Sequence, residues 1–329
     1  MRAMTRGRSI GAACAVVGAA VCWAAPSVTS ARVIGNGTAR SCTSAAVVAA
    51  VRAGGTIRFS CGPKPVTVRM RATAKVLNTR RRVILDGGGR ITLSGAGERR
   101  ILYMDTCDPA QRFTTPDCTD QATPRLTVKD IAFTNGNSTG EQFDGGGGGA
   151  IFVRGGRLRI LRSTFIGNRC DAEGPDIGGG AVRALSQYHG QAVDVVASRF
   201  TDNVCSNGGA LSSIDVSWRI KDSRFSDNRA IGRGANPARQ GTPGGGSGGA
   251  IYNDGNRFTL TISNSRLTGN HAEEGGGAIF FVSNDRTGTL RIEHSVLKGN
   301  PNRGFQTAGL PGIFFLGAKP PTITDSVLR

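Results

Sequence analysis

Residues 198–211 read SRFTDNVCSNGGAL, and the two phrases in this stretch decide the fold. The first phrase is Ser-x-Phe/Leu-x-x-Asn, and its aromatic or leucine position recurs at Phe165, Phe200, Phe225, Leu267 and Leu297. The second phrase is Gly-Gly-Ala followed by an aliphatic residue, and its alanine recurs at Ala150, Ala181, Ala210, Ala250 and Ala278. The phrases alternate along the chain, which indicates one structural repeat interrupted by insertions.

This repeat predicts a parallel β-solenoid. Frequent Gly and Asn exclude the long amphipathic stretches of a helical repeat, whereas short alternating runs such as 158–160, 193–195 and 260–262 are typical of strands between turns. Coils that stack at strand spacing, about 4.8 Å, would place the Phe/Leu positions in one internal ladder. The recurring Asn would satisfy backbone amides at a turn. We therefore expect an all-β parallel β-helix of about ten coils over residues 32–329, as a single domain.

The segment before the repeats predicts a cap for the first coil. Residues 44–53 are rich in Ala and Val, follow Thr43 or Ser44 as N-cap, and end at Gly54, so we expect a short capping helix. Strands are expected at 56–59, 66–70, 83–85, 91–93 and 101–104, with a turn at 86–89. A cap is needed because an open first coil would present unpaired backbone groups.

The first 31 residues predict a secretory signal peptide. Arg2, Arg6 and Arg8 precede an apolar run over 10–25, and small residues follow up to Ala31. The run is about 16 residues long, shorter than the roughly 20 needed to cross a bilayer, so we expect no transmembrane segment. The leader predicts a secreted, extracellular protein, and association with a cell wall remains open.

The six cysteines after the leader predict disulfides. Zinc ligation is disfavoured because no Cys-x-x-Cys pair occurs and the three His are scattered. Cys170 and Cys205 each lie two residues after a repeat Asn, so stacking would bring their Cα atoms to about 5 Å and allow a bridge between coils. Cys42 with Cys61 and Cys107 with Cys118 are the simplest remaining pairs among the possible connectivities.

The composition is strongly basic. Lys and Arg total 41 against 23 Asp and Glu, giving a formal net charge of +18, and 35 of the basic residues are Arg. The excess indicates acidic partners or, alternatively, a GC-rich coding sequence. Nucleic acid is disfavoured because the chain is predicted to be exported and has few Tyr and Trp for base stacking.

The repeated GGAI and FxxN phrases resemble those of the polymorphic outer membrane protein passengers. The chain after the leader also resembles a right-handed parallel β-helix of the pectate-lyase-like superfamily. The resemblance implies a right-handed coil. It leaves activity open, because that superfamily includes polysaccharide lyases, glycoside hydrolases, adhesins and proteins of other roles.

Two columns of residues are candidates for ligand binding. If the aliphatic residue after each Ala faces inward, the next one faces outward, which gives the column Phe152, Arg183, Ser212, Tyr252 and Phe280. Aromatic rings and guanidinium groups suit sugars with anionic substituents, but such a column also suits contact with a covering loop. The residue before each Phe/Leu predicts a second, basic column of Arg199, Arg224 and Arg266, which Asp202, Asp222 and Asp227 could neutralise.

Candidates for catalysis are fewer. Asp215 and Asp254 follow the repeated Ala by four or five residues and are the best available carboxylates. Asp171, Glu173 and Asp176 could hold Ca²⁺ if the protein were a lyase; otherwise no cofactor is expected. We therefore expect non-catalytic binding to an extracellular or cell-wall polysaccharide. The alternatives are a lyase or hydrolase acting on an acidic polysaccharide and a structural or adhesive surface protein, with the oligomeric state open.

Overall fold

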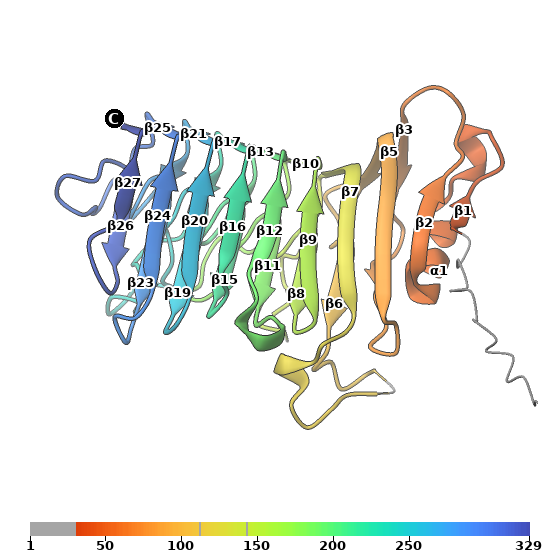
Figure 1. The fold of residues 1–329 in the computed structure, drawn as a ribbon, viewed down its shortest axis with the longest axis horizontal. Coiled ribbons are helices and arrows are strands. Elements are labelled where there is room, and N and C mark those ends of the chain that lie inside the picture. Colours follow the sequence, from red (N-terminus) through yellow and green to blue (C-terminus); the bar gives the residue numbers. More distant parts are fainter. Residues whose placement is uncertain (1–30, 112, 143) are drawn as a thin grey trace, which may run out of the picture.

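The chain winds into an elongated parallel β-helix whose coils stack along one axis (Figure 1). The structure is a computed structural model and describes residues 31–111, 113–142 and 144–329. Strands of neighbouring coils pair in parallel, as in β10 with β13 and β11 with β15. The predicted all-β fold is confirmed. The predicted signal peptide, residues 1–31, lies outside the described residues except for its last position.

Three sides of the rod are formed by strands. The long face comprises β1 (Arg32–Ile34), β2 (Gly55–Phe59), β5 (Arg82–Ser94), β7 (Arg125–Thr134), β9 (Arg157–Leu161), β12 (Val193–Val196), β16 (Trp218–Lys221), β20 (Thr259–Ser263), β24 (Thr289–Glu293) and β27 (Thr322–Thr324). The short face comprises β3 (Val66–Arg69), the second halves of β5 and β7, β10 (Thr164–Ile166), β13 (Arg199–Thr201), β17 (Arg224–Ser226), β21 (Arg266–Thr268), β25 (Val296–Lys298) and β28 (Val327–Leu328). These two faces meet at a bend and are continuous through β5 and β7.

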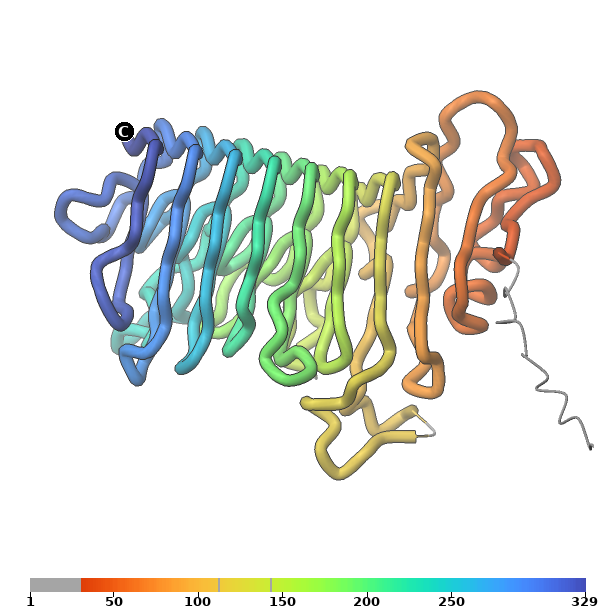
Figure 2. Tube along the Cα trace, in the orientation of Figure 1, coloured from red at the N-terminus to blue at the C-terminus, as the bar shows by residue number. Residues whose placement is uncertain are grey.

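The third side is a separate sheet, which we call the third sheet. It comprises β4 (Ala74–Lys75), β6 (Leu102–Asp105), β8 (Ile151–Arg154), β11 (Val182–Leu185), β15 (Leu211–Ile214), β19 (Ile251–Gly255), β23 (Ile279–Ser283) and β26 (Ile313–Leu316). A short ladder of β14 (Val204–Cys205), β18 (Arg229–Ala230) and β22 (His271–Ala272) lies between the short face and the third sheet along the chain. The path of one coil after another is clearest in the Cα trace (Figure 2).

The predicted capping helix is α1 (Ser44–Ala53), at the N-terminal end of the rod (Figure 1). The Thr43 hydroxyl accepts a hydrogen bond from the Ala46 amide at 3.2 Å, and the helix ends at Gly54, whose φ is +72°. Val47 and Val51 are fully buried against the first coil. Three short 3-10 helices occur at Ala39–Ser41, Cys118–Asp120 and Tyr188–Gly190.

The recurring Phe/Leu positions form the predicted internal ladder. The ring centroids of Phe165 and Phe200 lie 4.7 Å apart, and those of Phe200 and Phe225 are also 4.7 Å apart, with nearly parallel planes. All three side chains are fully buried. The ladder also includes Phe133, which the repeat pattern does not predict, at 5.1 Å from Phe165.

The repeat Asn side chains form a second internal ladder. From Asn168 to Asn270, each repeat Asn Nδ2 donates to the Oδ1 of the Asn one coil further on, for example from Asn168 to Asn203 and from Asn203 to Asn228, both at 2.9 Å. The same Nδ2 of Asn203 donates to the Phe165 carbonyl at 3.1 Å. These contacts satisfy buried amides that would otherwise cost about 1–3 kcal/mol each. The recurrence of Asn therefore has a structural cause.

The Gly-Gly-Ala phrase is explained by close packing at the entry to the third sheet. Gly208, the first glycine of one copy, has a φ of +50°, in the left-handed region that favours glycine. A Cβ on the second, Gly209, would lie 2.5 Å from the Gly249 carbonyl oxygen of the next coil. Only two consecutive glycines therefore allow the chain to turn and the coils to approach.

The three predicted disulfides are present. Cys170 and Cys205 join neighbouring coils with a Cα–Cα distance of 4.8 Å, close to the predicted 5 Å. Cys42 pairs with Cys61 in the cap region, and Cys107 pairs with Cys118. The stacking of the repeats is thus confirmed by a covalent contact between residues 35 positions apart.

One predicted turn is wrong. Residues 86–89 lie inside the continuous strand β5, where the pairing with β7 shifts register between Asp86 and Ile91. Gly88 and Gly89 have positive φ values, so the chain forms an irregularity that carries β5 from the long face to the short face. The glycines do bend the chain, as their sequence indicates. The residues before and after the bend both pair in parallel with β7, so the whole segment is one strand.

Candidate functional site

The predicted outward column of the third sheet exists but is buried. Parallel register aligns Phe152 with Arg183, Arg183 with Ser212, Ser212 with Tyr252, and Tyr252 with Phe280. Each of these side chains is at most 2% exposed. The prediction that Phe152, Arg183, Tyr252 and Phe280 present a surface for sugar rings is therefore wrong.

Loops from the same coils cover this column. The Arg183 guanidinium donates to the Asp176 carbonyl in the loop before β11 and to the Ser212 hydroxyl. Asn236, in the long loop before β19, donates to the Tyr252 hydroxyl at 2.6 Å. Period-two alternation correctly predicted which side of the strand these residues occupy, but it carries no information about segments that fold back over the sheet.

Arg183 is a charged side chain buried within this column. It is 1% exposed, its Nε has no hydrogen-bond partner, and no described carboxylate lies within 4.0 Å of its guanidinium. Burial lowers its pKa to about 10, because the charged form loses its hydration. The residue is held by neutral oxygens, so its role is structural.

The predicted basic column is exposed. Arg199 pairs in register with Arg224, and Arg224 with Arg266, on three consecutive coils of the short face. All three side chains are exposed, and none has a carboxylate within 4.0 Å among the described residues. We call Arg199, Arg224 and Arg266 the arginine ladder. Asp202, Asp222 and Asp227 flank it in sequence but form no ion pair with it in the described part of the chain.

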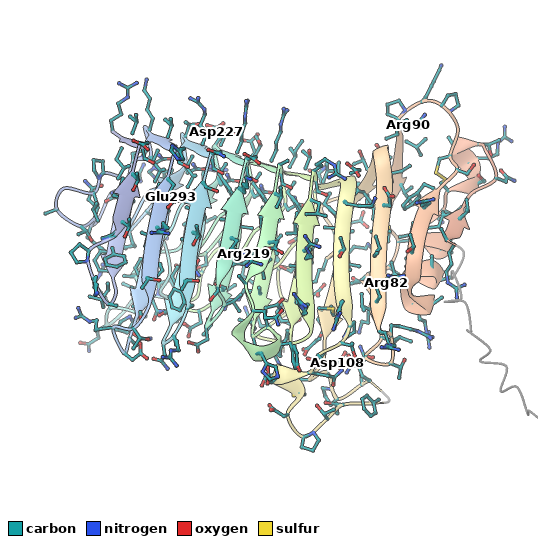
Figure 3. The ribbon with its side chains drawn as sticks, in the orientation of Figure 1. Arg82, Arg90, Asp108, Arg219, Asp227 and Glu293 are labelled. Carbon is teal, nitrogen blue, oxygen red and sulfur yellow. A yellow bond between two sulfur atoms is a disulfide. The ribbon has the colours of Figure 1, made fainter. Side chains whose placement is uncertain are left out.

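A second basic site escaped the sequence analysis. An open pocket of about 540 Å³ lies at the corner where the chain enters β5, and its lining residues are Gly55, Thr79, Arg80, Arg81, Arg82, Thr123 and Arg125. Arg82 and Arg125 are register partners on neighbouring coils, and Arg157 follows on the next. We call this site the arginine pocket. Figure 3 shows Arg82 on the long face, toward the capped end of the rod.

The arginines of the pocket lack acidic partners. No carboxylate lies within 4.0 Å of Arg80, Arg81, Arg82 or Arg125 among the described residues. The Arg80 Nε donates to the Arg52 carbonyl at 2.9 Å, which fixes that side chain beside the pocket. In the sequence, only the run Arg80-Arg81-Arg82 points to this basic site. Arg125 is distant in the chain and lies beside Arg82 because of the register between coils.

Other arginines of the long face are neutralised. Asp194 accepts from Arg219 at 2.8 Å and lies 3.2 Å from Arg159, so one carboxylate serves both neighbouring coils. Asp86 similarly contacts Lys129 at 2.9 Å and Arg58 at 3.7 Å. Figure 3 shows Arg219 further along the face that carries Arg82. The arginine pocket, in contrast, groups four arginines that have no such partner among the described residues.

Asp254, one of the two predicted catalytic candidates, lies in a largely buried group of polar side chains. Its Oδ2 accepts from the Tyr252 hydroxyl at 3.1 Å and from the Asn236 Nδ2 at 3.0 Å. The same Nδ2 lies 3.1 Å from the Asp176 Oδ1, which brings two carboxylates close to one amide. Burial raises the pKa of Asp254, and its hydrogen bonds oppose that shift.

Asp215 does not join this group. It is exposed at the turn after β15, with a φ of +54°, and its carboxylate accepts a hydrogen bond from the Asn256 amide. Asp215 and Asp254 lie on neighbouring coils, and the Asp215 amide donates to the Asp254 carbonyl at 2.9 Å. Their carboxylates bind different groups, so a catalytic role for the two residues stays a prediction.

The predicted calcium ligands are separated. Asp171 accepts from the Gly140 amide at 2.9 Å and from Gln142 at 3.1 Å, so it ties its loop to the preceding coil. Glu173 is exposed, and Asp176 faces Asn236 instead. Within the described part of the chain, no three His, Cys, Asp or Glu side chains converge as metal ligands. The prediction that Asp171, Glu173 and Asp176 form one calcium site is wrong, because the three carboxylates do not converge.

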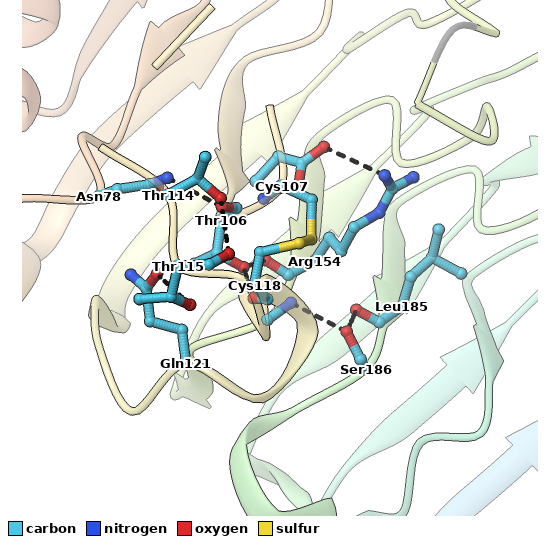
Figure 4. Close-up of a disulfide and its surroundings, with 12 residues drawn as sticks. Asn78, Thr106, Cys107, Thr114, Thr115, Cys118, Gln121, Arg154, Leu185 and Ser186 are labelled. Atoms are coloured by element: carbon cyan, nitrogen blue, oxygen red, sulfur yellow. Dashed lines mark hydrogen bonds and ion pairs between the residues drawn. A yellow bond between two sulfur atoms is a disulfide. The ribbon is translucent and has the colours of Figure 1, made fainter. Parts of the chain in front are cut away.

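The disulfide Cys107–Cys118 (Figure 4) closes a loop that projects from the rod (Figure 1). The Thr106 hydroxyl lies 2.6 Å from the Cys118 carbonyl and 2.9 Å from the Arg154 carbonyl, which fixes the loop base to β8. Asn78 donates to the Thr106 carbonyl at 3.0 Å. The loop is thus anchored beside residues 78–82, close in the chain to the arginine pocket.

Replacing Asp254 by Asn tests its burial. A carboxyl with a raised native pKa binds its proton more tightly when folded, so its contribution to stability falls as pH rises from the unfolded pKa through the native one. We expect D254N to be more stable than the parent at pH 7 by more than the ~0.5 kcal/mol typical of surface changes, and the gain to disappear at pH 3. Urea unfolding at both pH values measures this.

The exposed D202N variant is the control for that experiment and should show no such pH-dependent gain. A gain for D254N that persists unchanged at pH 3 would contradict the assignment, because the carboxyl is then protonated in both states.

Comparison with known proteins gives one local match. Residues 222–254 match the Chlamydia polymorphic membrane protein (Chlamydia_PMP) repeat, which comes from a surface-exposed outer membrane family. The matched segment contains one copy of each repeated phrase, Ser223 to Asn228 and Gly248 to Ile251. No curated protein and no solved structure matches the chain.

The location suggested by these findings is extracellular. The three disulfides are typical of an oxidising compartment, and the repeat is one of surface proteins. Separately, the described residues contain no helix of the length and apolarity that a membrane span requires. The chain thus resembles a surface passenger in the repeat of residues 222–254.

Proposed function

We propose that this protein is a non-catalytic binding protein for an acidic polysaccharide at an extracellular or cell-wall surface. The arginine pocket is the observation that carries the proposal. Arg80, Arg81, Arg82 and Arg125 surround an open space without a compensating carboxylate, and guanidinium groups pair readily with carboxylate, sulfate and phosphate. An anionic ligand would offset their mutual repulsion.

The remaining lining of the pocket suits a carbohydrate. Thr79 and Thr123 contribute hydroxyl groups, and Gly55 leaves room at the base. The aromatic residues that were predicted to stack on sugar rings are buried, so charge and hydrogen bonding would dominate recognition. Such binding weakens with salt, because exposed charges are screened over about 10 Å at 0.1 M.

The test compares the pocket with a charge-matched surface. We expect the R81Q/R82Q/R125Q variant to bind heparin and polygalacturonate at least tenfold more weakly than the parent, measured by biolayer interferometry at 0.1 M salt. The control R233Q/R257Q/R286Q removes the same charge from exposed positions far along the chain and should retain most of the affinity. Neutral dextran should not bind.

Two results would contradict the proposal. Equal losses in the pocket and control variants would mean that net charge alone attracts the polymers. Release of unsaturated or reducing ends during incubation would mean that the protein is an enzyme. A parallel R199Q/R224Q/R266Q variant measures how much the arginine ladder contributes to binding. We expect a smaller contribution, because these three residues are not among those that line the arginine pocket.

A polysaccharide lyase or hydrolase of the pectate-lyase-like superfamily is the second candidate. The raised pKa of Asp254, with Tyr252 and Asp176 nearby, supports it. Turnover abolished by D254N would establish that role. An inert protein that binds no glycan would instead leave the structural or adhesive alternative.

A further inference from the structure

The arginine pocket groups the positive charge of several arginines. Four arginines are among the residues that line about 540 Å³, and no described carboxylate lies within 4.0 Å of their guanidinium groups. Elsewhere on the long face the chain supplies a carboxylate for neighbouring arginines, as Asp194 does for Arg159 and Arg219. The pocket therefore favours a ligand that carries more than one unit of negative charge.

Phosphate supplies more charge and more acceptors than a carboxylate. A phosphomonoester carries about −1.5 to −2 at pH 7 and three strong acceptor oxygens, whereas a uronic carboxylate carries −1 and two oxygens. The three phosphate oxygens can accept hydrogen bonds from the N–H groups of several arginines at once. A sulfate ester has as many oxygens but only a single charge.

The donors of the pocket approach from two coils. Arg80, Arg81 and Arg82 come from the segment that leads into β5, and Arg125 begins β7 on the next coil. The contact of Arg80 Nε with the Arg52 carbonyl leaves its terminal nitrogens free of that bond. A tetrahedral group with three acceptors suits donors that arrive from different directions, whereas a planar carboxylate suits one guanidinium fork.

We propose that the arginine pocket recognises a phosphomonoester carried on a sugar. This inference rests on the proposed function, in which the ligand is an acidic polysaccharide. It specifies that the anionic group of that ligand is a phosphomonoester. The cavity exceeds the volume of one phosphate, since a water molecule occupies about 30 Å³ in the liquid, so the attached sugar can enter beside Thr79 and Thr123. In this arrangement the arginines bind the phosphate, and the threonine hydroxyls form hydrogen bonds with the sugar.

The experiment uses one polymer with three substituents. Dextran bearing phosphomonoester, sulfate or carboxymethyl groups at equal density is titrated onto the full chain by isothermal calorimetry at pH 7.5. We expect phosphorylated dextran to bind at least tenfold more tightly than either of the others. We also expect its affinity to fall on going to pH 5, because the second phosphate ionisation lies near pH 6, while sulfated dextran keeps its affinity.

The R81Q/R82Q/R125Q variant should lose the preference for phosphate and its pH dependence, while R233Q/R257Q/R286Q should keep both. Unfolding curves show whether each variant folds. If carboxymethyl or sulfated dextran binds as tightly as the phosphorylated form, phosphate recognition is refuted and the proposed function stands. If no charged dextran and no acidic polysaccharide binds, both are refuted.

Discussion

Replacing Phe200 by Ala is expected to lower the free energy of unfolding by about 3–5 kcal/mol. The side chain is fully buried, and its ring is stacked between Phe165 and Phe225 with centroid distances of 4.7 Å on both sides. Truncation removes the ring from two neighbours at once and leaves a cavity that a rigid column of rings cannot close. Urea unfolding followed by circular dichroism measures the change.

The adjacent R199A variant is the matched control for F200A. Arg199 lies on the same strand but is exposed and has no ion pair among the described residues. We expect it to change stability by no more than about 0.5 kcal/mol. Similar losses for both variants would contradict the assignment of inner and outer positions. Since each coil contacts only its neighbours, F200A also tests whether one weakened coil destabilises the whole rod.

Removing the disulfide between Cys170 and Cys205 is expected to cost about 4 kcal/mol, by the entropy of closing a loop of this length in the unfolded chain. The two cysteines are 35 residues apart and join successive coils. The C170S/C205S variant is compared with the oxidised parent by urea unfolding. Ser replaces Cys with little change of volume, so the lost cross-link dominates the effect.

The C107S/C118S variant provides the comparison for that result. Its disulfide encloses a sequence separation of only 11, for which the same relation gives about 3 kcal/mol. That loop also projects from the rod (Figure 1), so its opening need not unfold the coils. If the C107S/C118S variant loses as much stability as C170S/C205S, or more, the coil-to-coil bridge is not the main cross-link of the fold.

The interior of the fold was predictable because each repeat repeats the same local chemistry. The positions of Phe200 and Asn203 recur with equivalent partners in the repeated coils, and the bridge between Cys170 and Cys205 follows from that register. Gly208 and Gly209 mark the point where coils approach too closely for a side chain. These contacts form within a coil or between neighbouring coils, so the repeated phrases carry the information that they need.

The functional surface was predicted less well. The exposed arginine ladder was predicted, since strand alternation fixes which side of the short face Arg199 occupies. The column with Tyr252 and Phe280 was placed on the correct side of its strand but was not expected to be covered. Its cover is a loop of irregular sequence, whose path depends on contacts such as that between Asn236 and Tyr252.

The amino-acid sequence by itself determined the stacked coils, the internal ladders, the cap and the bridge between Cys170 and Cys205, because repetition at strand spacing places equivalent residues of neighbouring coils side by side. Only the tertiary structure decided which outward residues meet solvent and which arginines lack a counterion. Arg82 and Arg125 become neighbours through the register of two coils separated by a long insertion. Loop paths and charge balance depend on such distant contacts, which no local pattern in the chain encodes.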